Sequence, residues 1–504
     1  MTLPARIEKK LDRLEKSKDF WFLLPTSILF FLLRLPSLFE PHWYGDEGIY
    51  QVLGLGLREG RPLYQGVFDN KPPLLYILYS VFNGDQFWLR FANLFFGIAT
   101  VIAFYFLAKA LFKKQKIIYI SSSIFAFLLA IPIIEGNIAN AENFMLFPII
   151  AAGYLLFKNS QKLLNHENKD KLNKAFFTSG FLLGIAFLVK IVALFDFVAF
   201  LIFLIFASYF FSASKRKAVS IFLIIKKSFI FAIGFIIPIV VTVFYFIFAN
   251  AFDYFAQAAL FSNIGYVGYG NKFLIPQGLL ILKSLLLSIF IIFIFFKRKK
   301  IELTGVFIFL WLGFSLFNAF FSQRPYTHYL LTLLPSFSLL IGYFFYQKGV
   351  RRFTFILIVV IFYLSTSNFW LFKRSAFYYQ NFSAFVSGSK NLENYQKFFD
   401  SNTPRDYLLA QFINANTKEE ENIFVWGNNA QLYKMTNKLP PGRYSVAYHI
   451  TNYKDGLENT EQGLLKSQPK FIIFMPYMKH YPFSLKDYTE RLSIGKALIY
   501  EKTF

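Results

Sequence analysis

Long apolar stretches dominate the first three quarters of the chain, and short polar segments separate them. Several stretches reach the roughly 20 apolar residues that an α-helix needs to cross a bilayer. The pattern predicts eleven membrane spans, including a short pair on either side of Lys190. The first is a retained span rather than a signal peptide, because it is long and no small-residue cleavage site follows it. The predicted spans are residues 20–38, 87–111, 117–134, 143–157, 175–189, 191–211, 227–249, 275–296, 303–321, 328–346 and 353–372.

Two longer segments separate predicted spans. Residues 39–86 contain "EGIYQVLGLGLREG" and "PPLLYILYSVF", in which apolar residues recur at helical spacing. These two parts predict amphipathic helices that lie in the membrane interface. Residues 250–274 are rich in Tyr and Gly and predict a mobile loop of the kind that closes over a site.

After residue 373 the apolar runs become short and charged residues separate them. "NIFVWG" and "PKFIIFMP" predict buried strands, and "TPRDYLLAQFINANT" predicts a helix opened by Thr-Pro. The pattern therefore predicts a polytopic α-helical membrane domain, residues 1–373, followed by a soluble α/β domain, residues 374–504.

Composition supports a membrane protein and excludes an ordinary soluble one. The chain is 56% hydrophobic and contains 70 Phe, with a mean hydropathy of +0.44. It has no Cys, which excludes disulfides and thiolate metal sites.

The net charge of +24 is distributed as a membrane topology requires, and this argues against nucleic acid as a partner. If the N-terminus is cytoplasmic, the inside segments hold 27 of the 38 Lys and Arg residues that precede residue 375. The C-terminal domain then lies outside the plasma membrane. These inside segments are residues 1–19, 109–116, 158–174, 215–227, 297–300 and 348–352.

Ionisable side chains from distant parts of the chain fall on the outer side in this topology. Ionisable groups at membrane depth are costly and are usually functional. The candidates are Asp46, Glu47, Asp69, Lys71, Glu135, Glu142, Lys190, Arg324 and His328.

Most of these candidates have a structural interpretation that is as good as the functional one. Lys190 can mark the end of a hairpin, and Glu142 can complement a helix N-terminus. Arg324 can bind lipid headgroups, and His328 can be an interfacial side chain. Glu135 is better explained as a solvated acid.

The adjacent acids Asp46 and Glu47 favour a functional interpretation. Trp43, Tyr44 and Tyr50 flank them, so this loop packs on the membrane instead of extending into water. Two carboxylates in such a position are unusual unless they serve a site.

Short motifs then suggest a family. "YGDEGIYQ" and "FDNKPPLLY" occur in the first outer loop, and "AENFMLFP", "GIAFLVK", "HYLLTLLP" and "VWGNNAQLY" follow in that order. Together they resemble the polyprenyl-phosphate-sugar-dependent membrane glycosyltransferases. This family includes protein O-mannosyltransferases and the bacterial aminoarabinose transferase that modifies lipid A. The resemblance covers most of the chain, although many relatives have more than eleven spans, so 11–13 are expected.

The resemblance implies a GT-C fold and an inverting transfer of a mannose- or aminoarabinose-like sugar. The donor would be a sugar on a polyprenyl phosphate such as undecaprenyl phosphate. The acceptor would be a hydroxyl or phosphate of an extracytoplasmic protein, lipid or envelope glycan. Asp46 matches the catalytic aspartate of the family, and Lys71 matches its phosphate-facing lysine. Glu47 would support Asp46 or bind the acceptor.

The side-chain chemistry of the remaining candidates suggests a role for each of them. Arg324 suits a second phosphate contact, because its planar guanidinium fits phosphate. His328 and Lys190 would add to it or bind sugar hydroxyls. The other substrate-binding candidates are Asp69, Glu142, Tyr266 and Tyr269.

Two alternatives remain open. The first is a metal site, because related metal-binding enzymes carry an Asp-x-Asp motif in the first loop. Asp46, Glu47 and Glu142 could supply oxygen ligands to a metal ion. A metal-free mechanism is favoured, because the Asp-x-Asp motif is missing from this sequence. A transporter or flippase for a lipid-linked sugar would share the spans and the basic residues. It would usually show internal repeats, and the sequence has none.

Overall fold

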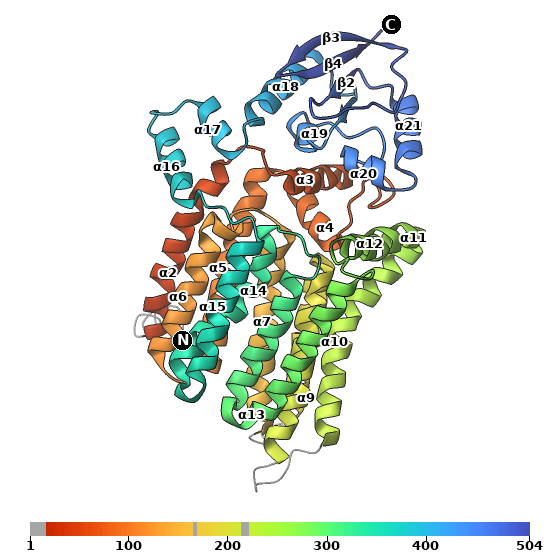
Figure 1. Cartoon of the computed structure of the whole chain (residues 1–504). Coiled ribbons are helices and arrows are strands. Elements are labelled where there is room, and N and C mark those ends of the chain that lie inside the picture. The colour runs from red at the N-terminus through yellow and green to blue at the C-terminus, as the bar shows by residue number, and fades with distance from the viewer. Residues whose placement is uncertain (1–16, 165–168, 213–220, 504) are drawn as a thin grey trace, which may run out of the picture.

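The computed structural model describes residues 17–164, 169–212 and 221–503, which form a helical bundle with a smaller α/β domain at one end (Figure 1). By length and composition, eight helices in these ranges can cross a membrane, and two shorter apolar helices accompany them. The eight are α2 (Lys18–Arg34), α5 (Gln86–Leu111), α7 (Ala141–Leu164), α8 (Lys169–Val189), α10 (Ile221–Phe248), α13 (Gly278–Ala319), α14 (Leu330–Tyr346) and α15 (Arg351–Asn368). The shorter two are α6 (Gln115–Ala130) and α9 (Leu194–Ser212).

The longest of these, α13, is a helical hairpin. Its backbone leaves the helical region at Glu302, where φ is 57° and ψ is 175°. The two arms then pack against each other, since a Cβ on Gly313 would lie 2.9 Å from Cδ1 of Phe290. The hairpin explains why one 42-residue helix stands where two spans are predicted. When the two arms of α13 are counted as separate spans, the long and short apolar helices together lie at the eleven positions where the sequence predicts spans.

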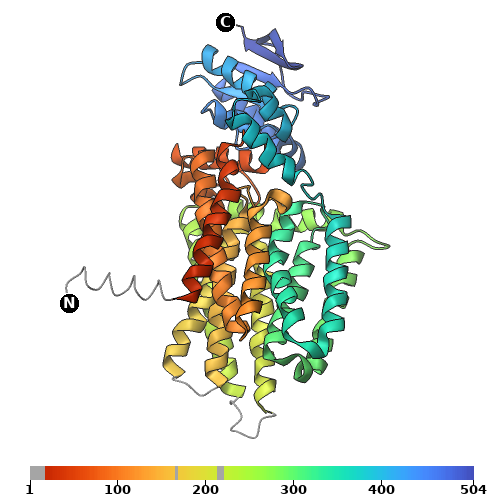
Figure 2. The same ribbon diagram turned by 90° about the vertical axis from the view of Figure 1, so that its left-hand side faces the viewer.

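Short helices cover the end of the bundle that carries the C-terminal domain (Figure 2). This end is called the outer end, because the distribution of Lys and Arg predicts that it faces outward. The first loop forms α3 (Gly45–Arg58) and α4 (Pro73–Val81), as predicted. α4 begins at a proline, whose fixed φ suits the first helical turn. Residues 47–56 of α3 are all buried, because α4 packs on one side and the C-terminal domain on another. Protein therefore covers this part of α3, and the position of α3 relative to the membrane interface stays a prediction.

The Tyr- and Gly-rich segment is helical, in place of the predicted loop. It forms α11 (Phe252–Phe255), the π-helix η4 (Ala256–Phe261) and α12 (Ser262–Gly270). The side-chain amide of Asn263 donates to the carbonyl of Asn70 at 2.9 Å. The segment therefore packs on the first outer loop.

The C-terminal part has the predicted α/β class. β1 (Ile423–Trp426) and β2 (Phe471–Phe474) coincide with the two predicted strands and pair in parallel. A hairpin that the sequence reading did not predict, β3 (Tyr488–Ile494) and β4 (Ala497–Lys502), completes the sheet in the order β1-β2-β4-β3. The helices of this part are α16 (Ser375–Val386), α17 (Leu392–Phe399), α18 (Thr403–Asn416), α19 (Gln431–Met435), α20 (Ala447–Asn452) and α21 (Gly456–Ser467).

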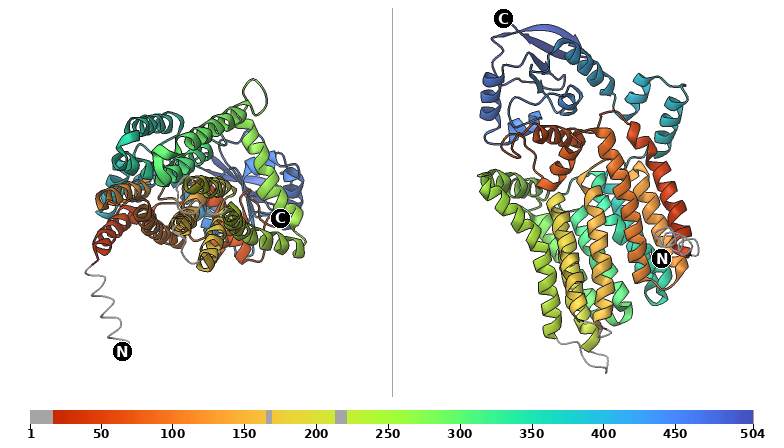
Figure 3. Two further views of the ribbon diagram at one scale, coloured as in Figure 1. Left: turned by 90° about the horizontal axis from the view of Figure 1, so that it is seen from below. Right: turned by 180° about the vertical axis from the view of Figure 1, so that it is seen from behind.

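The C-terminal domain lies directly on the first outer loop (Figure 3). The guanidinium of Arg443 donates to the carbonyl of Tyr64 at 2.9 Å, and Phe68 N–H donates to the Arg443 carbonyl at 2.9 Å. Arg61 donates to the carbonyl of Pro440 at 2.8 Å. These contacts hold the segment that precedes α20 against the loop that contains "FDNKPPLLY".

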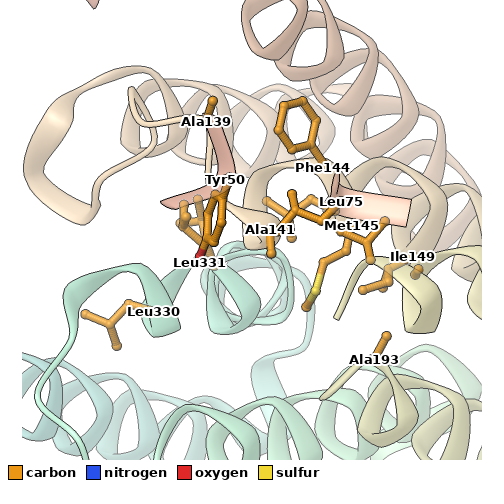
Figure 4. Packing of buried hydrophobic residues seen from close by; sticks show 14 of the residues in the cluster. Tyr50, Leu75, Ala139, Ala141, Phe144, Met145, Ile149, Ala193, Leu330 and Leu331 are labelled. Atoms are coloured by element: carbon orange, nitrogen blue, oxygen red, sulfur yellow. The ribbon is translucent and has the colours of Figure 1, made fainter. Parts of the chain in front are cut away.

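One apolar layer supports the outer-end elements (Figure 4). It joins Tyr50 of α3 and Leu75 of α4 to Phe144 and Met145 of α7 and to Leu331 of α14, and all five are buried. Close packing of this kind leaves little freedom to the elements above it. The polar side chains of the outer end are therefore held in defined positions.

Candidate active site

Asp46 and Lys71 come together at Tyr50. α3 begins at Gly45, so Asp46 lies in its first turn and Tyr50 one turn later on the same face. The Tyr50 hydroxyl donates to Oδ2 of Asp46 at 3.3 Å. The Lys71 ammonium lies 4.8 Å from the centre of the same ring, within the range of a cation–π contact. An acid and a cation from separate parts of the first loop therefore share one aromatic side chain.

The loop holds Lys71 by both its backbone and its side chain. Its ammonium lies 3.3 Å from Oδ2 of Asp69, and its N–H donates to the Tyr76 hydroxyl at 3.0 Å. Tyr76 in turn donates to Asp69 at 2.8 Å, and the Tyr64 hydroxyl donates to the Lys71 carbonyl at 2.7 Å. Asp69 thus holds Lys71 in place.

Three carboxylates act on the Lys71 ammonium. Burial disfavours the charged form, but the negative charges of Asp69, Asp46 and Glu142 outweigh burial and raise the pKa of Lys71 above its ordinary value. The ammonium is therefore charged at neutral pH. Asp46 and Glu142 lie 96 positions apart in the sequence, yet both carboxylates are close enough to the Lys71 ammonium to raise its pKa.

The C-terminal domain adds a histidine to this cluster. Nε2 of His449, in α20, lies 3.7 Å from Oδ1 of Asp69. Burial lowers the pKa of His449 to about 4 despite the nearby Asp69 charge, so the imidazole is neutral at neutral pH. Burial would raise the pKa of Asp69, but the charge of Lys71 and the hydrogen bond from Tyr76 help to lower it below its ordinary value. Asp69 is therefore an ionised partner of Lys71.

Glu47 faces away from Asp46 and is fully paired. Arg90 of α5 binds it through two hydrogen bonds, Nε to Oε1 at 3.0 Å and Nη2 to Oε2 at 2.6 Å. Nη1 of Arg90 also lies 2.7 Å from Oε2 of Glu40. Tyr378 of α16 donates to Glu40 at 2.6 Å. Glu47 therefore belongs to a buried ionic network that joins α3, α5 and the C-terminal part.

A second polar cluster forms where α7, α8 and α14 meet the first loop. Glu142 pairs with the ammonium of Lys190, and Nε2 of His328 lies 3.8 Å from Oε1 of Glu142. Nδ1 of His328 lies 3.0 Å from Oε2 of Glu135, which also accepts from the Tyr44 hydroxyl at 2.6 Å. Tyr44 directly precedes α3, so this cluster adjoins Asp46.

The second cluster changes the interpretation of two residues. Glu135 is not the solvated acid that the sequence predicts, because Tyr44 and His328 both contact it. Lys190 does mark the end of α8, but its ammonium also lies 4.8 Å from the centre of the Tyr329 ring. Lys190 therefore faces the residues of the site.

The functional roles of all the predicted site residues stay predictions, and three of these residues lie outside the contacts described so far. Arg324 is half-buried in the segment between α13 and η5 (Thr327–Tyr329), two residues before Tyr326, whose ring stacks on His328 at 5.8 Å. Tyr266 and Tyr269 belong to α12, but their side chains are outside the described part of the structure. Among the residues that are described, no group of three or more His, Asp and Glu side chains is arranged to hold a metal ion.

The sequence reading missed five residues that shape the site: Glu40, Tyr44, Arg90, Tyr448 and His449. Arg90 carried a signal, because a lone arginine inside an apolar span needs a partner. Tyr448 is partly exposed, and partial burial together with the charges of Asp46 and Asp69 raises the pKa of its phenol, which therefore lies in the field of both acids. Nothing in the sequence linked α20 to the first loop, since nearly 400 residues separate them.

Part of the membrane domain matches a model of a known protein family. Residues 56–255 match the model of the dolichyl-phosphate-mannose-protein mannosyltransferases. The resemblance to GT-C glycosyltransferases is therefore confirmed over these residues. The matched range contains Lys71, Glu142 and Lys190 and begins ten residues after Asp46. The predicted enzyme class is therefore confirmed.

Solved structures share the fold of this glycosyltransferase. ArnT from Cupriavidus metallidurans in the apo state is 12% identical over 96% of this chain and 98% of its own, with a TM-score of 0.57. With undecaprenyl phosphate bound, the same protein gives 11% identity, the same coverage and a TM-score of 0.50. Likeness at this identity shows the fold, and it confirms the predicted multi-pass GT-C architecture.

Two further comparisons concern the C-terminal domain and the whole chain. Residues 405–491 match a family model named for the C-terminal domain of Ccs4, a competence-induced protein. A comparison with curated protein sequences finds no match.

Proposed function

We propose that this glycosyltransferase moves a sugar from a polyprenyl-phosphate lipid to a hydroxyl group on the outer side of the plasma membrane. The observation that carries the proposal is the meeting of Asp46 and Lys71 at Tyr50. Transfer from a lipid phosphate needs one group that removes a proton from the acceptor and one that receives the phosphate charge. A carboxylate and an ammonium that is charged at neutral pH, both in contact with one aromatic side chain, supply both.

The reaction follows from these two groups. Asp46 takes the proton of the acceptor hydroxyl while the acceptor oxygen attacks the anomeric carbon of the sugar. The bond from that carbon to the phosphate oxygen breaks, and the electron pair leaves with the phosphate. Lys71 meets the growing negative charge, and Asp69 keeps the ammonium in place. Attack from the face opposite the phosphate inverts the anomeric centre.

The neighbouring residues have supporting roles in this proposal. Glu47 orients the start of α3 through Arg90 and does not contact substrate, which separates its role from that of Asp46. Glu142, Lys190 and His328 bind sugar or acceptor hydroxyls beside the base.

Several finer expectations from the sequence remain part of the proposal. Arg324 is a second phosphate contact, and Tyr266 and Tyr269 lie against the sugar. The sugar is mannose- or aminoarabinose-like, and the acceptor belongs to an extracytoplasmic protein, lipid or envelope glycan. The N-terminus is cytoplasmic and the C-terminal domain is extracytoplasmic.

Purified full-length protein, offered a panel of polyprenyl-phosphate sugars and candidate acceptors, tests the proposal. At least one donor should yield free polyprenyl phosphate and a glycosylated acceptor by mass spectrometry. Lys71→Ala should lower kcat/KM for that donor by roughly 10- to 100-fold, because a charge-assisted contact to the phosphate is lost. Lys272→Ala, at an exposed outer position, is the matched control and should change little.

Two results would contradict the proposal. Equal donor use by Lys71→Ala and the control would remove Lys71 as the phosphate contact. Movement of a lipid-linked sugar across vesicle membranes without any transfer to an acceptor would favour a flippase.

A further inference from the structure

A large cavity lies far from the active site, at the end of the bundle opposite the C-terminal domain. It has a volume of about 830 Å³ and is bounded by the turn of the α13 hairpin, the end of α14, η6 (Lys348–Val350) and the start of α15. These segments lie together at the lower end of the bundle in Figure 2. Phenylalanine rings form much of its wall, from Phe293, Phe309, Phe344, Phe353 and Phe355.

Five cations surround the mouth of this cavity. Lys297 and Lys300 come from the turn of the α13 hairpin. Lys348, Arg351 and Arg352 come from η6 and the start of α15, and all five are exposed. In the described ranges none of them forms an ion pair with an acidic side chain, and no acid lines the cavity.

Membrane topology explains the sign of these charges but not their arrangement. The positive-inside rule requires basic residues in each inner segment and does not require two segments to face each other across a cavity. Here the two inner segments 297–300 and 348–352 enclose one apolar space.

The surroundings of the cavity determine what can fill it. Its neighbours Ile292, Ile356 and Val359 are exposed apolar side chains on α13 and α15, as expected of helices that face lipid. An apolar space that opens beside lipid-facing helices offers water few hydrogen-bonding partners and suits an acyl chain. The phosphate of such a lipid would lie at the basic mouth, since basic pockets between membrane helices attract anionic headgroups.

We propose that this cavity binds an anionic phospholipid from the membrane leaflet opposite the C-terminal domain. An acyl chain occupies the phenylalanine-lined space, and the headgroup phosphate pairs with Lys348, Arg351 and Arg352 on one side and with Lys297 and Lys300 on the other. The bound lipid joins the α13 hairpin to α14 and α15. The proposal rests on the membrane-spanning fold and is independent of the proposed reaction.

Native mass spectrometry of the full-length protein with added lipid tests this proposal. The probe is dioleoylphosphatidylglycerol, and dioleoylphosphatidylcholine has the same acyl chains without the net charge. The wild-type protein should retain phosphatidylglycerol in preference to phosphatidylcholine. The triple variant K348Q/R351Q/R352Q should bind phosphatidylglycerol at least roughly tenfold more weakly.

A matched triple variant controls for the general loss of basic residues. Lys113, Lys114 and Lys116 are exposed on another inner segment and do not line the cavity. K113Q/K114Q/K116Q should keep wild-type binding. Equal losses in both variants, or no preference over phosphatidylcholine, would overturn the proposal.

Two further measurements keep the result interpretable. Soluble sn-glycerol 3-phosphate should compete weakly, and full competition would show a headgroup site without an acyl-chain site and overturn the proposal as stated. If the cavity variant fails to accumulate, K297Q/K300Q on the opposite rim serves in its place and should also weaken binding. Wild-type binding in that variant would contradict the two-sided site.

Discussion

At the scale of single residues, two adjacent acids have separate partners because an α-helix turns about 100° per residue. Asp46 faces the Tyr50 hydroxyl and lies within electrostatic reach of Lys71, whereas Glu47 turns into the protein and pairs with Arg90. A buried ion pair adds little net stability but is costly to break, since the remaining charge is left uncompensated. Asp46 is therefore free for chemistry, and Glu47 fixes the helix that presents it.

Glu47→Gln should mainly lower the stability of the protein. It should have a smaller effect on the turnover of the molecules that remain folded. Loss of one carboxylate beside buried Arg90 should cost roughly 3 kcal/mol, because Glu40 alone then balances the guanidinium. The thermal midpoint and the activity per folded molecule are the measurements. Glu59→Gln, at the exposed end of the same helix, is the control and should change neither. A Glu47→Gln protein with a wild-type midpoint and no turnover would instead make Glu47 a catalytic residue.

At the scale of elements, α3 is the link between the two halves of the molecule. One side of it packs on α4, and another approaches α19 of the C-terminal domain so closely that only glycine fits. A Cβ on Gly48 would lie 2.9 Å from the backbone nitrogen of Gln431, whereas a Cβ on Gly45 would have no neighbour within 4 Å. Contact with the C-terminal domain therefore constrains the helix that carries Asp46.

Gly48→Ala should loosen the C-terminal domain and lower turnover, while Gly45→Ala should do neither. The added methyl group at Gly48 forces a shift of the α19 backbone, and overpacking of this kind costs roughly 1–3 kcal/mol. Hydrogen exchange of α19 and α20, measured together with activity, separates the two variants. Equal exchange and equal activity in both would show that the domain contact has no effect on the site.

The sequence predicted the elements well where periodicity or a turn residue determines them. The spans, α3, α4 and the strands β1 and β2 follow from apolar spacing. Asp69, Lys71 and Glu142 were selected because the predicted topology places them on the same side of the membrane, and their roles stay predictions. The hairpin β3–β4, whose turn contains Gly495 and Lys496 at positive φ, was missed because polar and charged residues interrupt the apolar pattern of β3. The place of His449 was not predictable, because no local pattern encodes how a distant domain packs on the first loop.

At the scale of the whole molecule, polar groups gather at one end of the bundle and basic residues line the other. The outer end combines the first loop, the second polar cluster and α20 (Figure 1). The opposite end carries the basic turns of α13 and η6. This asymmetry matches the topology that the Lys and Arg distribution predicts.

Reporter fusions test that topology directly. A reporter placed at Gly270, the last residue of α12, and one at the C-terminus should both report the outer side, and one at Gly349 should report the cytoplasm. The physical reason is the excess of Lys and Arg in the inner segments. A cytoplasmic signal at Gly270 or at the C-terminus would contradict the placement of the active site.

The central claim is that Asp46 is the base of a sugar transfer from a lipid phosphate. Single-turnover release of polyprenyl phosphate by Asp46→Asn protein tests it, alongside donor binding and the control Asp253→Asn at an exposed outer position. The account predicts a rate lower by roughly 10²–10⁴-fold for Asp46→Asn with donor affinity little changed, and a wild-type rate for the control. A wild-type rate for Asp46→Asn would contradict the account.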